Sequence, residues 1–254
     1  MIEQIIYLLE NYGKTFLKGL GATLLLAICG TLFGLLIGIL IAVIRNNKVL
    51  PTDSTIKKIL KRIGLGITYV YITVLRGTPM MVQALIIYFG GKMIGIPWNS
   101  TELGKMFIDG HLVCGLFVIT LNTAAYMAEN VRAGINAIDP GQMEASRALG
   151  MTYFETMVHV IIPQALKNAI PNIGNEFIVN IKDSSVLNVI TVSELFLSVK
   201  IATSNNYYTV AGYVIVAAIY LILTLVATVI VKKIEELTSD RRKVEKLERL
   251  QVKE

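Results

Sequence analysis

Two long stretches of the chain contain no charged residue. Residues 19–44 form an uninterrupted run of 26, and residues 201–231 form a second run whose most apolar part begins near Val210. A helix needs about 20 predominantly apolar residues to cross the core of a bilayer. Only 17% of all residues are charged, against about 25% in soluble domains. The chain is therefore expected to fold as membrane-spanning helices.

Three further stretches are candidate spans. Residues 112–128 form one. Residues 63–91 are interrupted only by Arg76 and are long for one span, so we expect a surface or tilted lead-in followed by a span starting near Arg76. Residues 170–197 are the weakest candidate, because charged residues in a span normally face a protein interior or a water-filled cavity. Their charges are Glu176, Lys182, Asp183 and Glu194. The expected fold class is an all-α membrane protein with about five spans.

Positive charges predict the orientation of these spans, because cytosolic loops carry an excess of Lys and Arg. Cations follow the first span at Arg45, Lys48, Lys57, Lys58, Lys61 and Arg62, and they follow the last span at positions that include Lys232, Lys233, Arg241, Arg242, Lys243 and Lys246. The loops 91–110 and 196–208 carry far fewer and are expected outside. The N-terminus is then outside and the C-terminus cytosolic. The net charge of +6 follows from this orientation and gives no evidence for nucleic acid.

We expect one transmembrane domain over residues 1–254, with a core at 19–232 and a mixed-charge cytosolic tail at 233–254. The residues before Gly19 lack a signal-peptide cleavage pattern, so the first span is expected to remain as an anchor. Cys29 and Cys114 both fall in apolar runs and are expected to be buried small hydrophobes.

A polar segment between two candidate spans carries its own helix signals. Asp139 can cap a helix, Pro140 suits its first turn, and Gln142 completes a capping-box-like spacing. Gly150 can take the left-handed conformation that ends a helix. The orientation places this segment on the cytosolic side.

A second helix is predicted directly after that glycine. Thr152 and Glu155 repeat the capping-box spacing. Pro163 and Pro171 are expected to limit its length, because proline lacks a donor and clashes with the preceding turn. A loop built as helix, glycine break, helix is expected to be held by something on the water side.

This segment resembles the EAA loop of bacterial ABC importer permeases. The family pattern is Glu-Ala-Ala, three residues, Gly, nine residues, Ile, one residue and Leu-Pro. The spacing is intact here, in Glu144, Ala145, Ser146, Gly150, Val160, Ile162 and Pro163. Three positions depart from the pattern, with Ser146 for Ala, Val160 for Ile and Ile162 for Leu. All three keep a packed helix pair possible.

The segment Leu75-Arg76-Gly77-Thr78-Pro79 forms a second signal. Arg76 is costly if it faces lipid, and Gly77 and Pro79 loosen the helix around it, which frees backbone groups that need partners. One interpretation is an arginine that snorkels to the cytosolic interface. The other is a cation held inside the bundle beside a pathway. The residues alone leave both open.

Arg-Gly-Thr-Pro followed by apolar residues and Gln83 is similar to polar amino acid ABC permeases, the group of the histidine and glutamine systems. Further matches follow in order: Asn122-Thr123-Ala124-Ala125-Tyr126, Glu129, Arg132, Gly134, Pro163-Gln164-Ala165, Pro171-Asn172, Lys182-Asp183-Ser184-Ser185 and Leu187. The EAA spacing alone implies an ABC importer permease, and the added segments narrow the resemblance to polar amino acids.

Two of these groups have competing interpretations. Glu129 sits three residues before Arg132, so the two share a helix face and form either a local ion pair or a gate or packing contact between spans. Lys182 and Asp183 are adjacent and cannot face each other on a helix, so each needs a partner elsewhere. With Ser184 and Ser185 they either line the pathway or form a polar seam between helices.

A stripe of small residues, Gly30, Gly34 and Gly38, recurs along the first span and permits close approach of another helix. Packing within the chain is favoured over contact with another subunit.

The resemblance implies a permease subunit that moves substrate by alternating access. It implies ATPase-coupling residues Glu144, Ala145, Ser146, Gly150 and Pro163. The candidate pathway residues are Arg76, Thr78, Gln83, Asn122, Glu129, Lys182, Asp183, Ser184 and Ser185.

The expected partners are two ABC ATPase subunits, an extracytoplasmic substrate-binding protein, a second permease copy or homologue, the bilayer and a polar amino acid. ATP and magnesium would be held by the ATPase. No phosphate loop of the form Gly-x-x-x-x-Gly-Lys-Ser/Thr occurs, and no metal-ligand or nucleophile arrangement is found, so no enzyme activity or cofactor is expected on this chain. An ABC permease for another small polar solute, or a stand-alone channel or carrier, is the alternative. The expected location is the bacterial cell membrane.

Overall fold

The structure, a computed structural model, describes residues 1–47, 49–96, 98, 100–103, 106–204 and 206–238. Among these residues, three helices are long and apolar enough to cross a membrane. They are α1 (Ile2–Asn46), α4 (Gly110–Asn136) and α9 (Thr209–Thr238). The count reaches five if each of two bent helix pairs is one span. The all-α membrane fold is confirmed, and residues 239–254 of the predicted tail lie outside the described residues.

The first bent pair overturns the prediction of a span that starts near Arg76. Helix α2 (Thr55–Gly77) is continuous through Arg76, and α3 (Met80–Met93) leaves it at 113°. Thr78 and Pro79 between them have extended backbones, as expected for a proline and the residue before it. With 14 residues, α3 is about 21 Å long, too short to cross a hydrocarbon core of about 30 Å. The predicted lead-in is therefore the longer helix of this pair.

The second bent pair forms the weakest predicted span. Helix α7 (Ile162–Asp183) continues into a 3₁₀-helix, η2 (Ser184–Ile190), and α8 (Leu195–Ser204) follows with a bend of 50°. Thr191 ends η2 with a φ of 62°, which a β-branched residue rarely adopts. The expected outer loop at 196–208 thus contains a helix.

A short antiparallel hairpin precedes α4. Its strands are β1 (Thr101–Leu103) and β2 (Met106–Ile108), with Thr101 opposite Ile108. No alternating pattern in the sequence predicted it.

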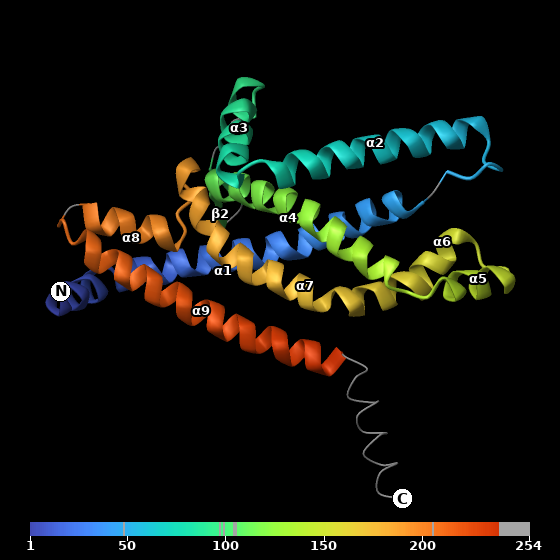
Figure 1. The fold of residues 1–254 in the computed structure, drawn as a ribbon. Coiled ribbons are helices and arrows are strands. Elements are labelled where there is room, and N and C mark those ends of the chain that lie inside the picture. Colours follow the sequence, from blue (N-terminus) through green and yellow to red (C-terminus); the bar gives the residue numbers. More distant parts are fainter. Residues whose placement is uncertain (48, 97, 99, 104–105, 205, 239–254) are drawn as a thin grey trace, which may run out of the picture.

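The long helices lie side by side, with α1 contacting α4, α7 and α8 (Figure 1). The N-terminus and α8 lie at one end of the bundle, which we call the α8 end. Helices α5 (Pro140–Ala148) and α6 (Tyr153–Thr156) project at the other, the α5–α6 end (Figure 1). The connection from α1 to α2 also lies at the α5–α6 end.

The glycine stripe of α1 packs against α4, as favoured from the sequence. Gly30, Gly34 and Gly38 face Ile119, Thr123 and Met127 in that order. A constant offset of this kind means that the two helices run parallel. A Cβ on Gly38 would lie 2.6 Å from the Met127 Cβ and 2.9 Å from the Ala128 backbone nitrogen, so only glycine permits this approach.

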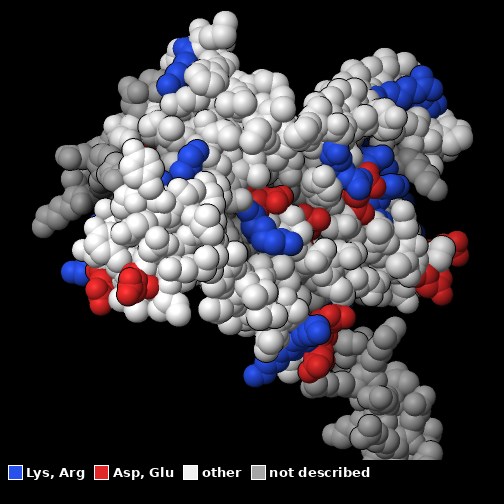
Figure 2. Space-filling model, turned by 60° about the vertical axis from the view of Figure 1, so that its left-hand side comes forward, with Lys and Arg blue, Asp and Glu red and all other residues white. Residues whose placement is uncertain are grey.

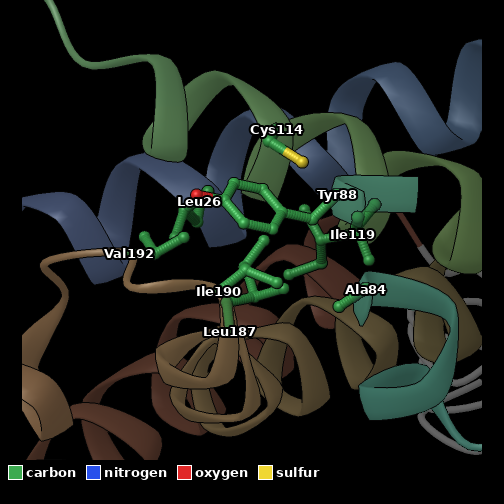
Figure 3. Packing of buried hydrophobic residues seen from close by; sticks show 9 residues of the cluster. Leu26, Ala84, Tyr88, Cys114, Ile119, Leu187, Ile190 and Val192 are labelled. Atoms are coloured by element: carbon green, nitrogen blue, oxygen red, sulfur yellow. The ribbon is translucent and has the colours of Figure 1, made fainter. Parts of the chain in front are cut away.

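A buried apolar cluster joins α4 to three other elements (Figure 3). It includes Leu26 of α1, Ala84 of α3, Ile119 of α4 and Leu187 of η2, each fully buried. Cys114 is fully buried in the same cluster, as expected of a small hydrophobe. The cluster holds the bend after α2 and the bend before α8 against the same stretch of α4.

Gly38→Ala is expected to destabilise the chain, because the new Cβ overlaps the backbone of α4. Overpacking of this kind costs about 1–3 kcal/mol. Thermal unfolding in detergent measures the effect. Gly66→Ala is the matched control, because a Cβ there meets nothing within 4 Å and alanine favours a helix by about 1 kcal/mol. An equal melting temperature for Gly38→Ala and the native chain would contradict the packing role of the stripe.

Candidate functional site

The loop at the α5–α6 end begins with a short, well-terminated helix. The Asp139 side chain accepts a 2.8 Å hydrogen bond from the Gly141 N–H and so caps α5. Gly150 ends it with a φ of +88°. The Met151 N–H donates to the Ser146 carbonyl and the Gly150 N–H to the Arg147 carbonyl, which is the Schellman arrangement. The predicted cap and glycine break are both confirmed.

The second helix starts as predicted and then differs. Thr152 and Glu155 form a reciprocal capping box at the start of α6. The prediction that Pro163 and Pro171 limit this helix is wrong. Helix α6 passes through a π-helical turn, η1 (Met157–Ile161), directly into α7, with Pro163 in its first turn and Pro171 inside it. Pro163 has no N–H, so a regular helix would lose one backbone hydrogen bond there. The wider π turn changes the backbone hydrogen-bond pattern just before Pro163.

Two large apolar side chains of this loop point into solvent. Leu149 is 86% exposed and Phe154 is 70% exposed, on either side of the glycine break. The predicted coupling residues lie around them: Glu144, Ala145, Gly150 and Pro163 are exposed, and Ser146 is buried with its hydroxyl bonded to the Gln142 carbonyl. Leu149 and Phe154 could have been identified from the sequence as apolar residues in a polar loop. They were not, because the prediction used only the spacing of the EAA pattern.

The break between α2 and α3 is held by two amide side chains. The Gln83 Nε2 donates to the Leu75 carbonyl at 2.9 Å and to the Thr78 carbonyl at 3.0 Å. The Asn122 Nδ2 donates to the Gln83 Oε1 at 3.0 Å and to the Leu75 carbonyl at 3.4 Å. The backbone groups freed at Pro79 therefore find the partners that the sequence required, and one of them comes from α4.

Arg76 lies beside α4 and away from the ends of the bundle. Its guanidinium carbon is 5.1 Å from the centre of the Tyr126 ring, a cation–π distance. Tyr126 lies ten residues, about 15 Å, before the end of α4. Arg76 also lines a cavity of about 260 Å³ with Arg45 and Glu129. Arg76 is thus an exposed residue that contacts an aromatic ring of α4 and borders a cavity with other charged groups.

A small group of charged side chains lies within the span region. Glu176 is within electrostatic range of Arg76 and Asp183. Lys182 is likewise within electrostatic range of Asp183. Figure 2 shows acidic and basic side chains meeting in the middle of one face, between broad uncharged areas. Lys182 is exposed, and Glu176 and Asp183 are half-buried.

Three other predicted pathway residues have hydrogen-bond or ion-pair partners within the chain. Ser184 is fully buried, and its hydroxyl donates to the Ile181 carbonyl. The Ser185 hydroxyl donates to the Lys182 carbonyl. Glu129 pairs with Arg132 at 2.8 Å and with Arg45 of α1, so its ion pair is both local and between helices.

Two buried polar residues were not among the predicted site residues, although Glu194 was noted as a charge within a candidate span. Asn180 of α7 accepts from the Thr123 hydroxyl at 3.0 Å and donates to Thr31 of α1 at 2.9 Å. Glu194 is fully buried and accepts from the Phe196 and Leu197 N–H groups at the start of α8. A polar residue inside an apolar run was the available signal for both.

The sequence matches a protein family over the part that holds both features. Residues 58–239 match the model of the binding-protein-dependent transport system inner membrane component. The chain belongs to this family. Its apolar helices and this membership make it a multi-pass membrane protein.

Relatives cover most of the chain. It is 34% identical to the probable amino-acid permease protein YxeN of Bacillus subtilis over 216 residues, 85% of this chain and 88% of the relative. It is 34% identical to the arginine transport system permease protein ArtQ of Bacillus subtilis over 86% of this chain and 90% of the relative.

Solved structures have the same fold. The crystal structure of an amino acid ABC transporter with histidines is 37% identical and has a TM-score of 0.69, covering 90% of this chain and 96% of that chain. An inward-facing methionine ABC transporter has a TM-score of 0.66 at 20% identity over 88% of this chain and 96% of that chain. The second likeness concerns the fold alone.

Gln83→Met is expected to destabilise the α2–α3 break, because methionine fills the volume but removes every hydrogen bond. The Leu75 and Thr78 carbonyls and the Asn122 amide lose a partner, and each buried unsatisfied group costs about 1–3 kcal/mol. Thermal unfolding measures this loss. Gln4→Met, in the first turn of α1, is the control. A Gln83→Met chain as stable as this control would exclude a role for Gln83 in holding the break.

Acid is expected to loosen the start of α6. Hydrogen bonds from the Thr152 backbone and side chain lower the pKa of Glu155 below its ordinary value. A carboxyl whose pKa is depressed by folding stabilises the fold above its unfolded pKa, and this contribution is lost as pH falls through the folded pKa. Hydrogen-exchange protection of the α6 amides, corrected for intrinsic rates, is therefore expected to fall below pH 4.5.

Glu155→Gln separates the charge from the cap, because glutamine also completes a capping box. In this variant, the hydrogen-exchange protection of the α6 amides is expected to stay constant over the same pH range. The same decline in both chains would show that the Glu155 carboxylate is not the titrating group.

Proposed function

We propose that this chain is the transmembrane permease subunit of an ATP-driven ABC importer for polar amino acids. Substrate would cross by alternating access, and ATP and magnesium would be bound by two separate ATPase subunits. A substrate-binding protein would deliver from outside, and a second permease, identical or homologous, would complete the pathway. Family membership supports the permease role, and the relatives named for amino acids support the substrate class.

The exposed pair Leu149 and Phe154 carries the coupling role. Exposed apolar residues on a polar loop mark protein interaction sites, and the caps around Gly150 make this loop stiff enough to transmit force. The ATPase would bind there, with Glu144, Ala145 and Ser146 in the docking helix. A stand-alone channel or carrier would leave this surface without a use.

The charge pattern supports the orientation, with the N-terminus outside and the C-terminus cytosolic. Arg45 lies in the last turn of α1, and Lys57, Lys58, Lys61 and Arg62 lie in the first two turns of α2, so these cations flank the α1–α2 connection at the α5–α6 end (Figure 1). Cytosolic loops are enriched in Lys and Arg. The α5–α6 end would therefore face the cytosol, where an ATPase can reach it.

The pathway is proposed to pass Arg76, Glu176, Lys182 and Asp183. Glu176, Lys182 and Asp183 all lie on α7, and ionisable groups within a span normally face a protein interior or water. Both signs of charge suit a zwitterionic substrate. Thr78, Gln83 and Asn122 support the α2–α3 break beside this group.

Leu149→Ser is expected to weaken binding of the ATPase by about 30-fold, because truncation of a central apolar contact costs about 2 kcal/mol. Co-purification of the partner ATPase and amino acid uptake by the reconstituted complex measure the effect. Folding is expected to be unchanged, because Leu149 is 86% exposed.

Leu50→Ser is the matched control, because Leu50 is also exposed and lies at the same end outside the α5–α6 loop. Normal ATPase binding and uptake by Leu149→Ser would remove the loop from the coupling mechanism.

A further inference from the structure

Two cavities lie between α7 and α9. The first, of about 270 Å³, is lined by apolar side chains that include Leu32 of α1, Ile173 and Phe177 of α7 and Ile234 of α9. Its one hydroxyl group belongs to Thr31, which accepts a hydrogen bond from Asn180 at 2.9 Å. This groove therefore offers apolar contact to whatever occupies it.

The second cavity, of about 630 Å³, lies nearer the α5–α6 end and is lined mainly by polar groups. The two cavities adjoin along both helices. On α7, Ile170 lines the apolar groove and Pro171 the polar cavity; on α9, Ile234 lines the groove and Glu235 the polar cavity. The space between α7 and α9 is thus apolar toward the middle of the span and polar toward its end.

The depth of this change matches one leaflet of a bilayer. The charge-free run of α9 ends at Val231, and the exposed cations Lys232 and Lys233 follow. From Lys167 in the polar cavity to Phe177 in the apolar groove is ten residues, or about 15 Å. This is half of a hydrocarbon core of about 30 Å.

The charges of the polar cavity favour a ligand that carries both signs. Among the described residues that line it, Lys167 is the cation and Asp139 and Glu235 are the carboxylates. Pro171 has no N–H, so the carbonyl of Lys167, four residues earlier, lacks its regular helical donor. One cation beside several acceptors suits a phosphate linked to a primary ammonium group.

We propose that this space binds one phospholipid with a primary-amine headgroup, of the phosphatidylethanolamine type. Lys167 contacts the phosphate, and Glu235 and Asp139 accept hydrogen bonds from the ammonium. An acyl chain lies along Ile173 and Phe177. An anionic headgroup meets two carboxylates, and a choline headgroup has no N–H to donate.

The bound lipid would connect three elements. Asp139 caps the start of α5 and lines the cavity with α7 and α9. The assignment to the cytosolic leaflet rests on the proposed function. The choice of lipid does not, and lipid retention by the purified chain is independent of transport.

Native mass spectrometry of the full chain, extracted from nanodiscs that contain equal amounts of phosphatidylethanolamine, phosphatidylcholine and phosphatidylglycerol, tests the proposal. We expect one retained phosphatidylethanolamine, at least fivefold in excess of either other lipid. Glu235→Gln is expected to reduce this excess to below twofold. Glu10→Gln, exposed on α1 at the α8 end, is the matched control and is expected to keep it.

Two further variants separate the parts of the site. Lys167→Ala is expected to lower retention of all three lipids, because each carries the phosphate. Leu32→Cys in a Cys29→Ser background tests for a second copy in the groove. Equal retention of the three lipids, an unchanged preference in Glu235→Gln, or efficient disulfide-linked dimers through Cys at position 32 would each overturn the proposal.

Discussion

The parallel contact of α1 with α4 is the constraint on which the rest of the structure depends. Because three glycines bring the two backbones together, the Thr123 hydroxyl on α4 and the Thr31 hydroxyl on α1 both reach Asn180 of α7. Interhelical hydrogen bonds within membranes contribute only about 0.6 kcal/mol each on average. Close packing therefore carries the association of these helices, while the buried amide selects the register in which α7 joins them.

A second face of α4 carries the polar chemistry. Asn122, Tyr126 and Asn130 recur every fourth residue, one position away from the row that meets the glycines. Asn122 supports the α2–α3 break and Tyr126 contacts Arg76. One helix thus fixes the packing of α1 on one side and orders the charged groups on the other. Irregular backbone at membrane depth is tolerated only where protein or a cavity satisfies it, so the break belongs beside this polar row.

Local chemistry made parts of this arrangement predictable. The charge-free runs gave α1 and α9, and the caps at Asp139, Gly150 and Thr152 gave the loop, because each signal lies within a few residues of its effect. The start of the second span was wrong, because the end of α2 depends on Gln83 and on Asn122, 47 residues from Leu75. Pro163 did not end its helix, because a π turn precedes it. For the site, the sequence identified the segments but could not show that the Arg76 side chain contacts Tyr126 of α4.

The geometry of the loop determines how a displacement would pass into the membrane. Helix α5 follows α4 after three residues, and η1 leads from α6 into α7 without a break. At the foot of the loop a Cβ on Gly134 would lie 2.5 Å from the Ala165 carbonyl oxygen, so α4 and α7 meet there backbone to backbone. In the proposed transporter, an ATPase that moves α5 and α6 therefore moves α4 and α7 together. The α2–α3 break must then move with α4 or lose its hydrogen bonds to Asn122. The free-energy cost of the conformational transition would therefore fall on the polar row of α4 beside Arg76.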